Sequence, residues 1–296
     1  MARAVKTMVS IILVNYNGKE QTLACLQSLA AVRVAVPYEV ILVDNHSSDD
    51  SVAAVGRAFP DVRVLPQDSN RGFGCANTIG AATAAGDYLF FVNNDTLFTR
   101  DIVTPLRDFL AAHPQAGAAG PMLLNPDGTF QLSYGKYPSL LNELRTKRDT
   151  AIMKQIPEDR VPRVVDWISF AAVMIPRSVF ERIDGFDERF FMYFEDVDMC
   201  HRMNDAGYRT FYCADFSLIH VGGASWTVTR RAPIRREYRR SQILYYTLHR
   251  SSLELFALRC YLSMKFILVF LLGRGDRRHA AASMLSLVWT FHAHRS

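Results

Sequence analysis

The chain has 296 residues, of which 49% are hydrophobic and 21% are charged. These proportions exclude an intrinsically disordered chain and allow a sizeable core, in one large α/β domain with an appendage or in two modest domains. The formal net charge is +5, and arginines crowd the last third of the sequence. A basic surface of this kind suits a phosphate-bearing partner, whether nucleotide, lipid headgroup or nucleic acid.

Apolar runs alternate with helical patterns through the first third of the chain. Strands are predicted at residues 9–14, 39–43, 62–65 and 88–92, and helices at 19–31, 50–59 and 74–85. Continuous apolar strands are typical of a parallel sheet that helices cover on both faces. The alternation therefore predicts an α/β fold, with a Rossmann-like, mostly parallel central sheet flanked by helices.

Polar residues follow three of these strands at the point where each strand ends. They are Asn15, Tyr16 and Asn17 after the first strand, Asp44 and Asn45 after the second, and Asn93, Asn94 and Asp95 after the fourth. Ligands of doubly wound sheets bind at the carboxyl ends of the strands. We therefore expect a ligand site at this edge of the sheet.

The middle of the chain is less regular. Residues 125–159 combine glycine, proline and charge with weak periodicity, and we interpret them as excursions that shape a cleft. Regular structure returns at 164–175, and a short helix is expected at 177–183. A further helix opens near Glu195, and short strands are predicted at 208–212 and 216–220.

The C-terminal region, residues 229–296, differs from the α/β domain at residues 1–228. Residues 230–240 hold six arginines, and residues 253–272 are strongly apolar but carry Glu254, Arg259 and Lys265. A spanning helix needs about 20 nearly uncharged residues. A helix in the headgroup region of an anionic membrane surface fits better, and the alternative is that these helices pack on the α/β domain.

The five cysteines include no CxxC pair, which argues against a disulfide framework or a zinc site and favours a reducing compartment. Residues 1–8 lack the pattern of a signal peptide, and the apolar run at 9–14 is too short for one. A cytoplasmic location is therefore expected.

Two of the polar clusters have an ordinary interpretation beside a functional one. Asp44 can accept a hydrogen bond from a pyrimidine ring N–H or can cap the Asx- and Ser-rich turn that follows, and alone it favours the turn. Residues 70–74, with Asn70 and Gly72, turn into a helix that contains Asn77. Such a turn can approach an anionic ligand closely, but most glycine-rich turns bind nothing.

Candidate metal ligands and acids stand further along. Asp95 offers the carboxylate oxygen that Mg²⁺ and Mn²⁺ prefer, although Asn and Asp also favour plain turns. His220 ends a predicted strand; a lone histidine is more often packed than ligating, yet imidazole suits Mn²⁺ better than Mg²⁺. Glu195 and Asp196 open a helix after the aromatic run 190–194. The helix dipole favours acids there, and the rings would also raise their pKa, which suits a general base.

The order and spacing of these segments resemble the glycosyltransferase family 2 enzymes of GT-A fold, and among them the bacterial rhamnosyltransferase-like group. The resemblance runs from residue 9 to residue 225. It is carried by VSIILVNYNG, VILVDNHSSDDS, NRGFGCANTIG, DYLFFVNND and the stretch 186–225, of which the last is the most specific.

The resemblance implies a role for each residue singled out above. The donor-binding set comprises Asn15, Tyr16, Asn17, Asp44, Asn70, Gly72, Asn77, Asn93 and Asn94, with Asp44 reading the pyrimidine. Asp95 stands in the place of the family's DxD motif and would hold the metal, with His220 as a late ligand. Asp196 would be the general base, beside Glu195. Two positions depart from the family pattern: Asn93 lacks the first acid of DxD, and Phe170 puts a ring near the expected acceptor region.

These roles imply an inverting, metal-dependent glycosyltransferase with Mn²⁺ or Mg²⁺ as cofactor. The expected donor is dTDP-L-rhamnose, with UDP-sugars next. The expected acceptor is a saccharide, polyprenyl-diphosphate-linked, in surface polysaccharide or cell-wall assembly. The protein would then work in the cytoplasm, peripheral on the inner face of the cell membrane. The C-terminal region, residues 229–296, also permits a soluble acceptor bound by an oligomer such as a homodimer.

Three other classes of protein remain as alternatives. A non-catalytic nucleotide-sugar-binding protein would not need Asp196, so the retained Glu195–Asp196 pair argues against it. A nucleotidyltransferase would want a glycine-rich basic loop after the first strand, where Asn15, Tyr16 and Asn17 stand. A nucleic-acid-binding protein is the weakest alternative, because no recognition module accompanies the arginine cluster.

Overall fold

The computed structural model describes residues 7–142, 160–222 and 231–291. Its main sheet has ten strands, eight of which follow the order β3-β2-β1-β4-β11-β6-β12-β5. The first four strands of the sequence are β1 (Val9–Asn15), β2 (Tyr38–Asp44), β3 (Arg63–Pro66) and β4 (Tyr88–Asn93), and they pair in parallel. The predicted mostly parallel α/β sheet is confirmed, with predicted strand ends within one residue of those observed.

The second half of the sheet mixes directions. Strand β11 (Ala172–Pro176) runs antiparallel to β4, and β6 (Ala116–Leu124) pairs in parallel with the long β12 (Arg209–His220). The two short strands expected at 208–212 and 216–220 are one strand, whose register shifts between Cys213 and Ser217. The remaining strands are β5 (Thr96–Leu97), β7 (Phe130–Gln131), β8 (Tyr134–Gly135), β9 (Arg163–Val165) and β10 (Trp167–Ile168).

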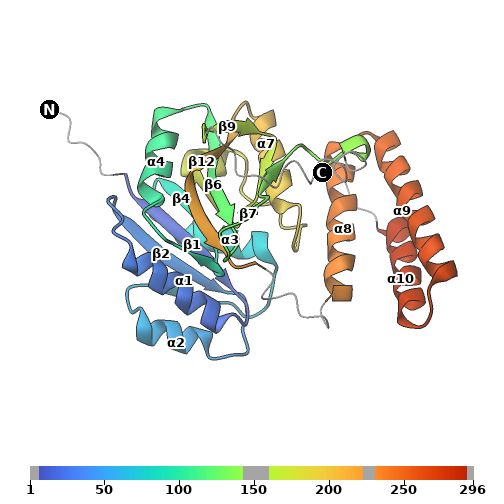
Figure 1. Cartoon of the computed structure of the whole chain (residues 1–296), viewed down its shortest axis with the longest axis horizontal. Coiled ribbons are helices and arrows are strands. Elements are labelled where there is room, and N and C mark those ends of the chain that lie inside the picture. Colours follow the sequence, from blue (N-terminus) through green and yellow to red (C-terminus); the bar gives the residue numbers. More distant parts are fainter. Residues whose placement is uncertain (1–6, 143–159, 223–230, 292–296) are drawn as a thin grey trace.

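Helices cover both faces of the sheet (Figure 1). On one face lie α1 (Lys19–Ala31), α2 (Ser51–Ala58) and α4 (Val103–Ala112), whose apolar side chains share a core with β1 and β2. On the other face lie α3 (Phe73–Thr83), α6 (Arg177–Arg182) and α7 (Glu195–Asp205), which share a second core with β4 and β11. Burial of both sheet faces explains why the strands read as continuous apolar runs.

Three helices form the C-terminal region: α8 (Arg231–His249), α9 (Ser252–Leu272) and α10 (Asp276–Thr290). They lie at the end of the molecule away from α1 and α2 (Figure 1). Buried residues of α8 share an apolar cluster with Phe190, Phe194 and Val197, so α8 packs on the α/β part. The expected boundary between residues 228 and 229 falls within 223–230, outside the described residues.

Helix α9 has a different environment. It is the one helix among the described residues that is long and apolar enough to cross a membrane by length and composition, and few of its residues are buried. Its charged residues are partly accommodated by the helix hairpin, because Arg259 donates to the Phe291 carbonyl at 2.9 Å and lies over the Trp289 ring. The charge of Arg259 is therefore held within the helix hairpin, whereas Lys265 is exposed.

Candidate functional site

The carboxyl ends of β1, β2 and β4 meet at one edge of the sheet. Asn15 is in register with Asp44, and Val14 is in register with Asn93. The three polar clusters predicted to form a ligand site therefore end at the same level of neighbouring strands. The register of the strands alone produces this convergence of residues that lie far apart in sequence.

A hydrogen-bond network centred on Asn15 holds this edge together. The Asn15 Nδ2 donates to Asp44 Oδ1 at 2.7 Å and to Ser47 Oγ at 3.0 Å. Its Oδ1 accepts from Thr22 Oγ1 at 2.9 Å and from Asn94 Nδ2 at 3.1 Å. Asn15 is fully buried, so its amide orders the strand ends from within.

Asp44 was expected either to cap a turn or to bind the donor, and its contacts show the turn. Its Oδ2 accepts the Ser47 N–H at 2.9 Å and its Oδ1 accepts the Ser47 hydroxyl at 2.6 Å, which is the Asx turn that the sequence favours. The carboxylate is almost fully buried, whereas Tyr16 is 46% exposed. Of the residues at the ends of β1 and β2 expected to bind the donor, Tyr16 therefore offers a ligand the most accessible side chain.

The turn before α3 depends on a glycine. Gly72 has a φ of +89°, and a Cβ on it would stand 2.2 Å from the Phe191 carbonyl oxygen. The next residue, Phe73, donates its backbone N–H to that same oxygen at 2.9 Å. Asn70 accepts from the buried Asn45 Nδ2 at 2.9 Å, which fixes the turn against β2. This glycine therefore lets the donor-side turn contact the loop that leads to α7.

Asn77 occupies the interior of α3. It is almost fully buried, and its Nδ2 donates to the Phe73 carbonyl one turn earlier at 3.1 Å. Asn17 has a φ of +52°, and its side-chain oxygen accepts the Ser48 N–H at 2.7 Å. Both amides are thus hydrogen-bonded within the fold, close to the turns that they stabilise.

Asp95 and His220 lie side by side. The pairing of β12 with β5 sets His220 opposite Thr96, and the His220 Nε2 is 3.2 Å from Asp95 Oδ1. Gln131 Nε2 donates to Asn125 Oδ1, so its Oε1 is the atom that accepts from His220 Nδ1, at 2.6 Å. The Nδ1 of His220 therefore carries a proton, and its Nε2 faces the carboxylate.

This arrangement fits a divalent cation. In the neutral ring the Nε2 lone pair and the Asp95 oxygen are two acceptors that face each other, which is unfavourable without a proton or a cation between them. Their separation of 3.2 Å matches neighbouring ligands of an octahedral ion with bonds of about 2.1 Å. Metal-binding histidines usually donate their other N–H to an oxygen acceptor, as His220 does to Gln131.

Glu195 and Asp196 begin α7 after two residues in the left-handed region. Tyr193 and Phe194 have φ values of +68° and +67°. Residues other than glycine rarely adopt this backbone conformation, and it persists only where surrounding contacts hold it. Such strain is most often found at functional sites, and here it directly precedes the Glu195–Asp196 pair.

Both carboxyl groups have a raised pKa. Burial raises the pKa of Asp196 to about 6, although hydrogen bonds from the backbone of Val197 and Phe170 lower it in part. Burial, with the neighbouring Asp196, raises the pKa of Glu195 well above its ordinary value. Among the described residues, no hydrogen-bond partner reaches Glu195 Oε2. Asp196, with a pKa of about 6, is therefore mostly ionised at neutral pH.

One turn connects the two halves of the site. The Ala171 carbonyl accepts the Asn93 N–H at 2.9 Å, two residues before Asp95, and the Phe170 backbone bonds to Asp196. The Phe170 ring, which was expected near the acceptor region, is almost fully buried. It stacks on Phe91 at 6.4 Å and lies edge-on to Phe186 at 5.6 Å.

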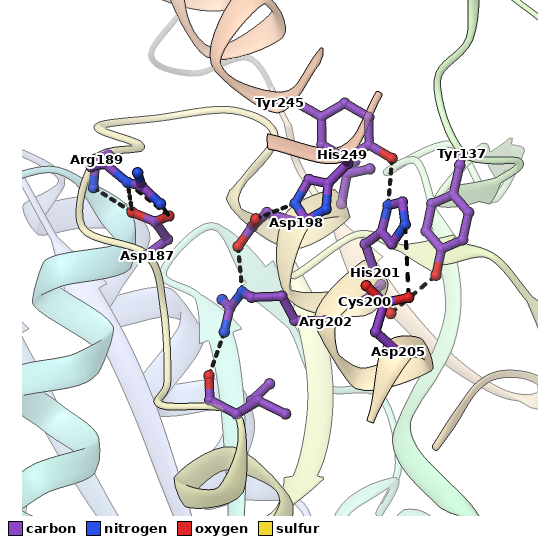
Figure 2. A network of polar contacts seen from close by, with 12 residues as sticks. Tyr137, Asp187, Arg189, Asp198, Cys200, His201, Arg202, Asp205, Tyr245 and His249 are labelled. Carbon is purple, nitrogen blue, oxygen red and sulfur yellow. Dashed lines mark hydrogen bonds and ion pairs between the residues drawn. The ribbon is translucent and has the colours of Figure 1, made fainter. Parts of the chain in front are cut away.

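A second group of potential metal ligands lies elsewhere. His201, Asp205 and His249 have ligand atoms within 4.8 Å of one another, on α7 and the end of α8. The two imidazole rings stack with centroids 4.3 Å apart and planes 18° apart (Figure 2). Nearly parallel rings point their in-plane lone pairs side by side and not at a common point, so this arrangement favours packing over coordination.

Sequence reasoning missed several supporting residues. Ser47 and Thr22 complete the Asn15 network, and Gln131 fixes the His220 ring. Ser47 lies in a turn-rich segment that suggests such a bond, whereas Gln131 belongs to a two-residue strand in an irregular region and carries no comparable signal.

The sequence is similar to those of known glycosyltransferases. The glycosyl transferase family 2 model matches residues 10–184. The chain is 34% identical over 222 residues to the N-acetylglucosaminyl-diphospho-decaprenol L-rhamnosyltransferase of Mycobacterium tuberculosis, covering 68% of this chain and 71% of that protein. It is 27% identical over 230 residues to the rhamnosyltransferase WbbL of Escherichia coli, covering 72% and 83% of the two chains.

The fold is also found in solved glycosyltransferases. The mannosyltransferase PcManGT from Pyrobaculum calidifontis, solved with GDP-Man and Mn²⁺, superposes with a TM-score of 0.58 at 18% identity, covering 98% of this chain and 77% of that one. At this identity the likeness concerns the fold alone. The chain belongs to glycosyl transferase family 2, as a rhamnosyltransferase-like glycosyltransferase of GT-A fold.

Proposed function

We propose that this protein transfers L-rhamnose from dTDP-L-rhamnose to a lipid-linked saccharide, with inversion at the anomeric carbon. The observation that supports the proposal most is that one turn, residues 169–171, bonds both the strand end beside Asp95 and the Asp196 carboxylate. Inverting transfer needs stabilisation of the leaving diphosphate on one side of the sugar and a base on the other. The Asp95–His220 pair and Asp196 are suited to these two tasks.

Asp196 is the proposed general base. With its pKa raised to about 6, the carboxylate is mostly ionised at pH 7 to 8 and still basic enough to accept a proton. It takes the proton of the acceptor hydroxyl as that oxygen attacks the anomeric carbon. The raised pKa of the neighbouring Glu195, caused by burial and by Asp196 itself, disfavours a second negative charge beside the base.

Asp95 and His220 are the proposed ligands of Mn²⁺ or Mg²⁺, with the donor phosphates completing the shell. When bound, the cation supplies charge neutralisation at the diphosphate leaving group. An imidazole in the ligand set favours Mn²⁺ over Mg²⁺. The Asn93 side-chain amide lies 3.4 Å from His220 Nε2, so the residue in the first DxD position borders the proposed cation site.

The donor nucleotide is proposed to lie along the ends of β1 and β2 and the start of α3. The exposed Tyr16 ring would contact the base, while the buried Asn15 and Asp44 and the half-buried Asn94 would set the shape of the pocket. The other donor-side residues proposed to line or shape the pocket are Asn17, Asn70, Gly72, Asn77 and Asn93. A purely binding role for this edge would leave the raised pKa of Asp196 without a purpose.

A lipid-linked acceptor requires access to a membrane, and α9 and α10 supply a surface for it. Exposed apolar side chains stand near the start of α9 and gather in its last three turns: Leu253, Phe256, Met264, Ile267, Leu268, Val269, Leu271 and Leu272. Exposed basic residues follow at the turn into α10: Arg274, Arg277, Arg278 and His279. This pairing is complementary to an anionic membrane surface, with α9 lying in the headgroup region of the inner face of the cell membrane.

A panel of sugar nucleotides tests the donor assignment. Thermal unfolding and slow hydrolysis are measured for dTDP-L-rhamnose, UDP-glucose, UDP-N-acetylglucosamine and GDP-mannose, each with and without Mn²⁺. Preferential, Mn²⁺-dependent stabilisation and hydrolysis of dTDP-L-rhamnose is expected. Preference for a UDP-sugar would transfer the assignment to UDP-sugar-dependent members of the family, and binding without any turnover would favour a sugar-nucleotide-binding protein.

A further inference from the structure

Helix α8 touches the loop that precedes the Glu195–Asp196 pair. Ser241, which is fully buried, donates its hydroxyl to the Met192 carbonyl at 2.8 Å. Met192 lies four residues before Asp196 and immediately before the two residues with positive φ. The hydroxyl of Ser241 thus fixes the backbone at the point where the chain enters its strained conformation.

Two more residues of α8 continue this contact at intervals of four, on the same side of the helix. The Tyr245 ring lies 5.7 Å from the Phe194 ring, and its hydroxyl is 2.9 Å from His201 Nδ1. His249 Nε2 donates to Asp198 Oδ1 at 2.7 Å (Figure 2). We call Ser241, Tyr245 and His249 the α8 stripe.

Asp198 is the partner that joins the stripe to α7. It is 1% exposed and shared between His249 and Arg202, whose Nε donates to Asp198 Oδ2 at 2.8 Å. A buried carboxylate needs such partners, because an uncompensated charge in the interior is strongly unfavourable. The hydrogen bond from His249 of α8 to Asp198 therefore holds the first turn of α7, two residues after Asp196.

The loop is held from the opposite side by the donor-binding turn. Phe73, at the start of α3, donates its N–H to the Phe191 carbonyl at 2.9 Å, and Gly72 makes room for this approach. Residues 191–194 are thus fixed between α3 and α8. Removal of either support would let the left-handed backbone of Tyr193 and Phe194 relax, and Asp196 would move with it.

On these contacts, and on the proposed role of Asp196 as base, we propose that Ser241 and His249 are positioning residues for Asp196. Helix α8 then belongs to the catalytic unit and is more than an attachment for the two helices that follow. The stripe acts through Met192 and Asp198, without touching the substrate.

Looser packing would also change the protonation of Asp196. Its raised pKa comes mainly from burial, and water admitted between α8 and the loop would lower it. Other ionisable groups that act on the pair are Tyr193 from the loop, Asp198 and Cys200 from α7 and Glu237 from α8. Ser241 does not titrate, so its replacement changes the packing around Asp196 without adding or removing a charge.

The test compares full-length Ser241→Ala and His249→Gln with Val103→Ala. Val103 is the first residue of α4 and is fully buried on the other face of the sheet, so its truncation loosens packing away from the loop. For both α8 variants, kcat should fall about ten- to a hundredfold with the KM for the donor nearly unchanged. The acid limb of the pH profile should move toward lower pH in Ser241→Ala and stay in place in Val103→Ala.

Each result separates this inference from the proposed function. If Ser241→Ala and His249→Gln retain the kcat and the acid limb of Val103→Ala while Asp196→Asn is inactive, the positioning role is wrong and the base assignment stands. If Asp196→Asn is as active as wild type, the proposed function itself fails. If one of the two α8 variants does not fold, the other, eight residues away along the α8 stripe, still tests the positioning role.

Discussion

Replacing Asp196 by asparagine should stabilise the protein while it removes activity. Burial holds the pKa of Asp196 at about 6, against 3.8 for an ordinary aspartate. A group whose pKa is raised in the folded state favours folding when protonated. Wild-type stability should therefore fall as the pH rises from about 4 to about 6, and the whole effect corresponds to about 3 kcal/mol.

Asparagine has nearly the same shape and no charge, so the variant should not show this fall. At pH 8 its free energy of unfolding should exceed that of wild type by up to about 3 kcal/mol, and at pH 4 by well under 1 kcal/mol. Urea unfolding at both pH values measures the difference. The activity should fall by about 10²- to 10⁴-fold, the usual contribution of a positioned base.

The matched control is Asp61→Asn, an exposed aspartate before β3. It should change stability by less than about 0.5 kcal/mol at either pH. If Asp196→Asn is destabilised at pH 8, or if its advantage is equal at pH 4 and pH 8, Asp196 does not carry a desolvated charge and the reasoning is refuted.

Three further predictions concern other parts of the molecule. Asp95→Asn should abolish the thermal stabilisation by Mn²⁺ with donor and lower activity by at least about 10²-fold, whereas an unchanged Mn²⁺ titration would remove Asp95 from the metal site. Gly72→Ala forces a side chain against the Phe191 carbonyl at a φ of +89° and should cost at least about 1–3 kcal/mol in urea unfolding; wild-type stability would show that the turn can move. Leu268→Ser with Leu271→Ser should weaken co-sedimentation with anionic vesicles about 100-fold and leave hydrolysis of soluble donor unchanged, and equal vesicle binding would exclude α9 as the contact.

The sequence predicted the first half of the fold well because those strands are buried on both faces. Helix α1 has the predicted bounds, and β1 to β4 end within one residue of them. Helix α4 and strand β6 were not predicted. The sequence of β6, AGAAGPMLL, contains no β-branched residue and is almost entirely buried, so neither composition nor alternation marks it as a strand.

The residues of the candidate site were identified more easily than their contacts. Asp95 and His220 were singled out separately, and their proximity follows from the antiparallel pairing of β12 with β5. Such long-range pairing leaves no local pattern. The burial of Asn15 and Asp44 was equally hidden, because polar residues at strand ends are usually expected to face solvent.

The packing of α8 against the loop before α7 was not predicted, because the start of this helix is strongly charged. The six arginines at 230–240 suggested a basic tail, while the buried residues of the helix, from Ser241 to Tyr246, come just after them. Their contacts are with an aromatic loop some 50 residues earlier, a separation at which periodicity gives no information.

The most direct test of the central claim is a crystal structure of the full chain with Mn²⁺ and dTDP-L-rhamnose. Mn²⁺ is expected about 2.1 Å from Asp95 and His220, with the Asp196 carboxylate facing the anomeric carbon from the side opposite the diphosphate. Mn²⁺ bound instead at His201, Asp205 and His249, or a donor sugar out of reach of Asp196, would contradict the account.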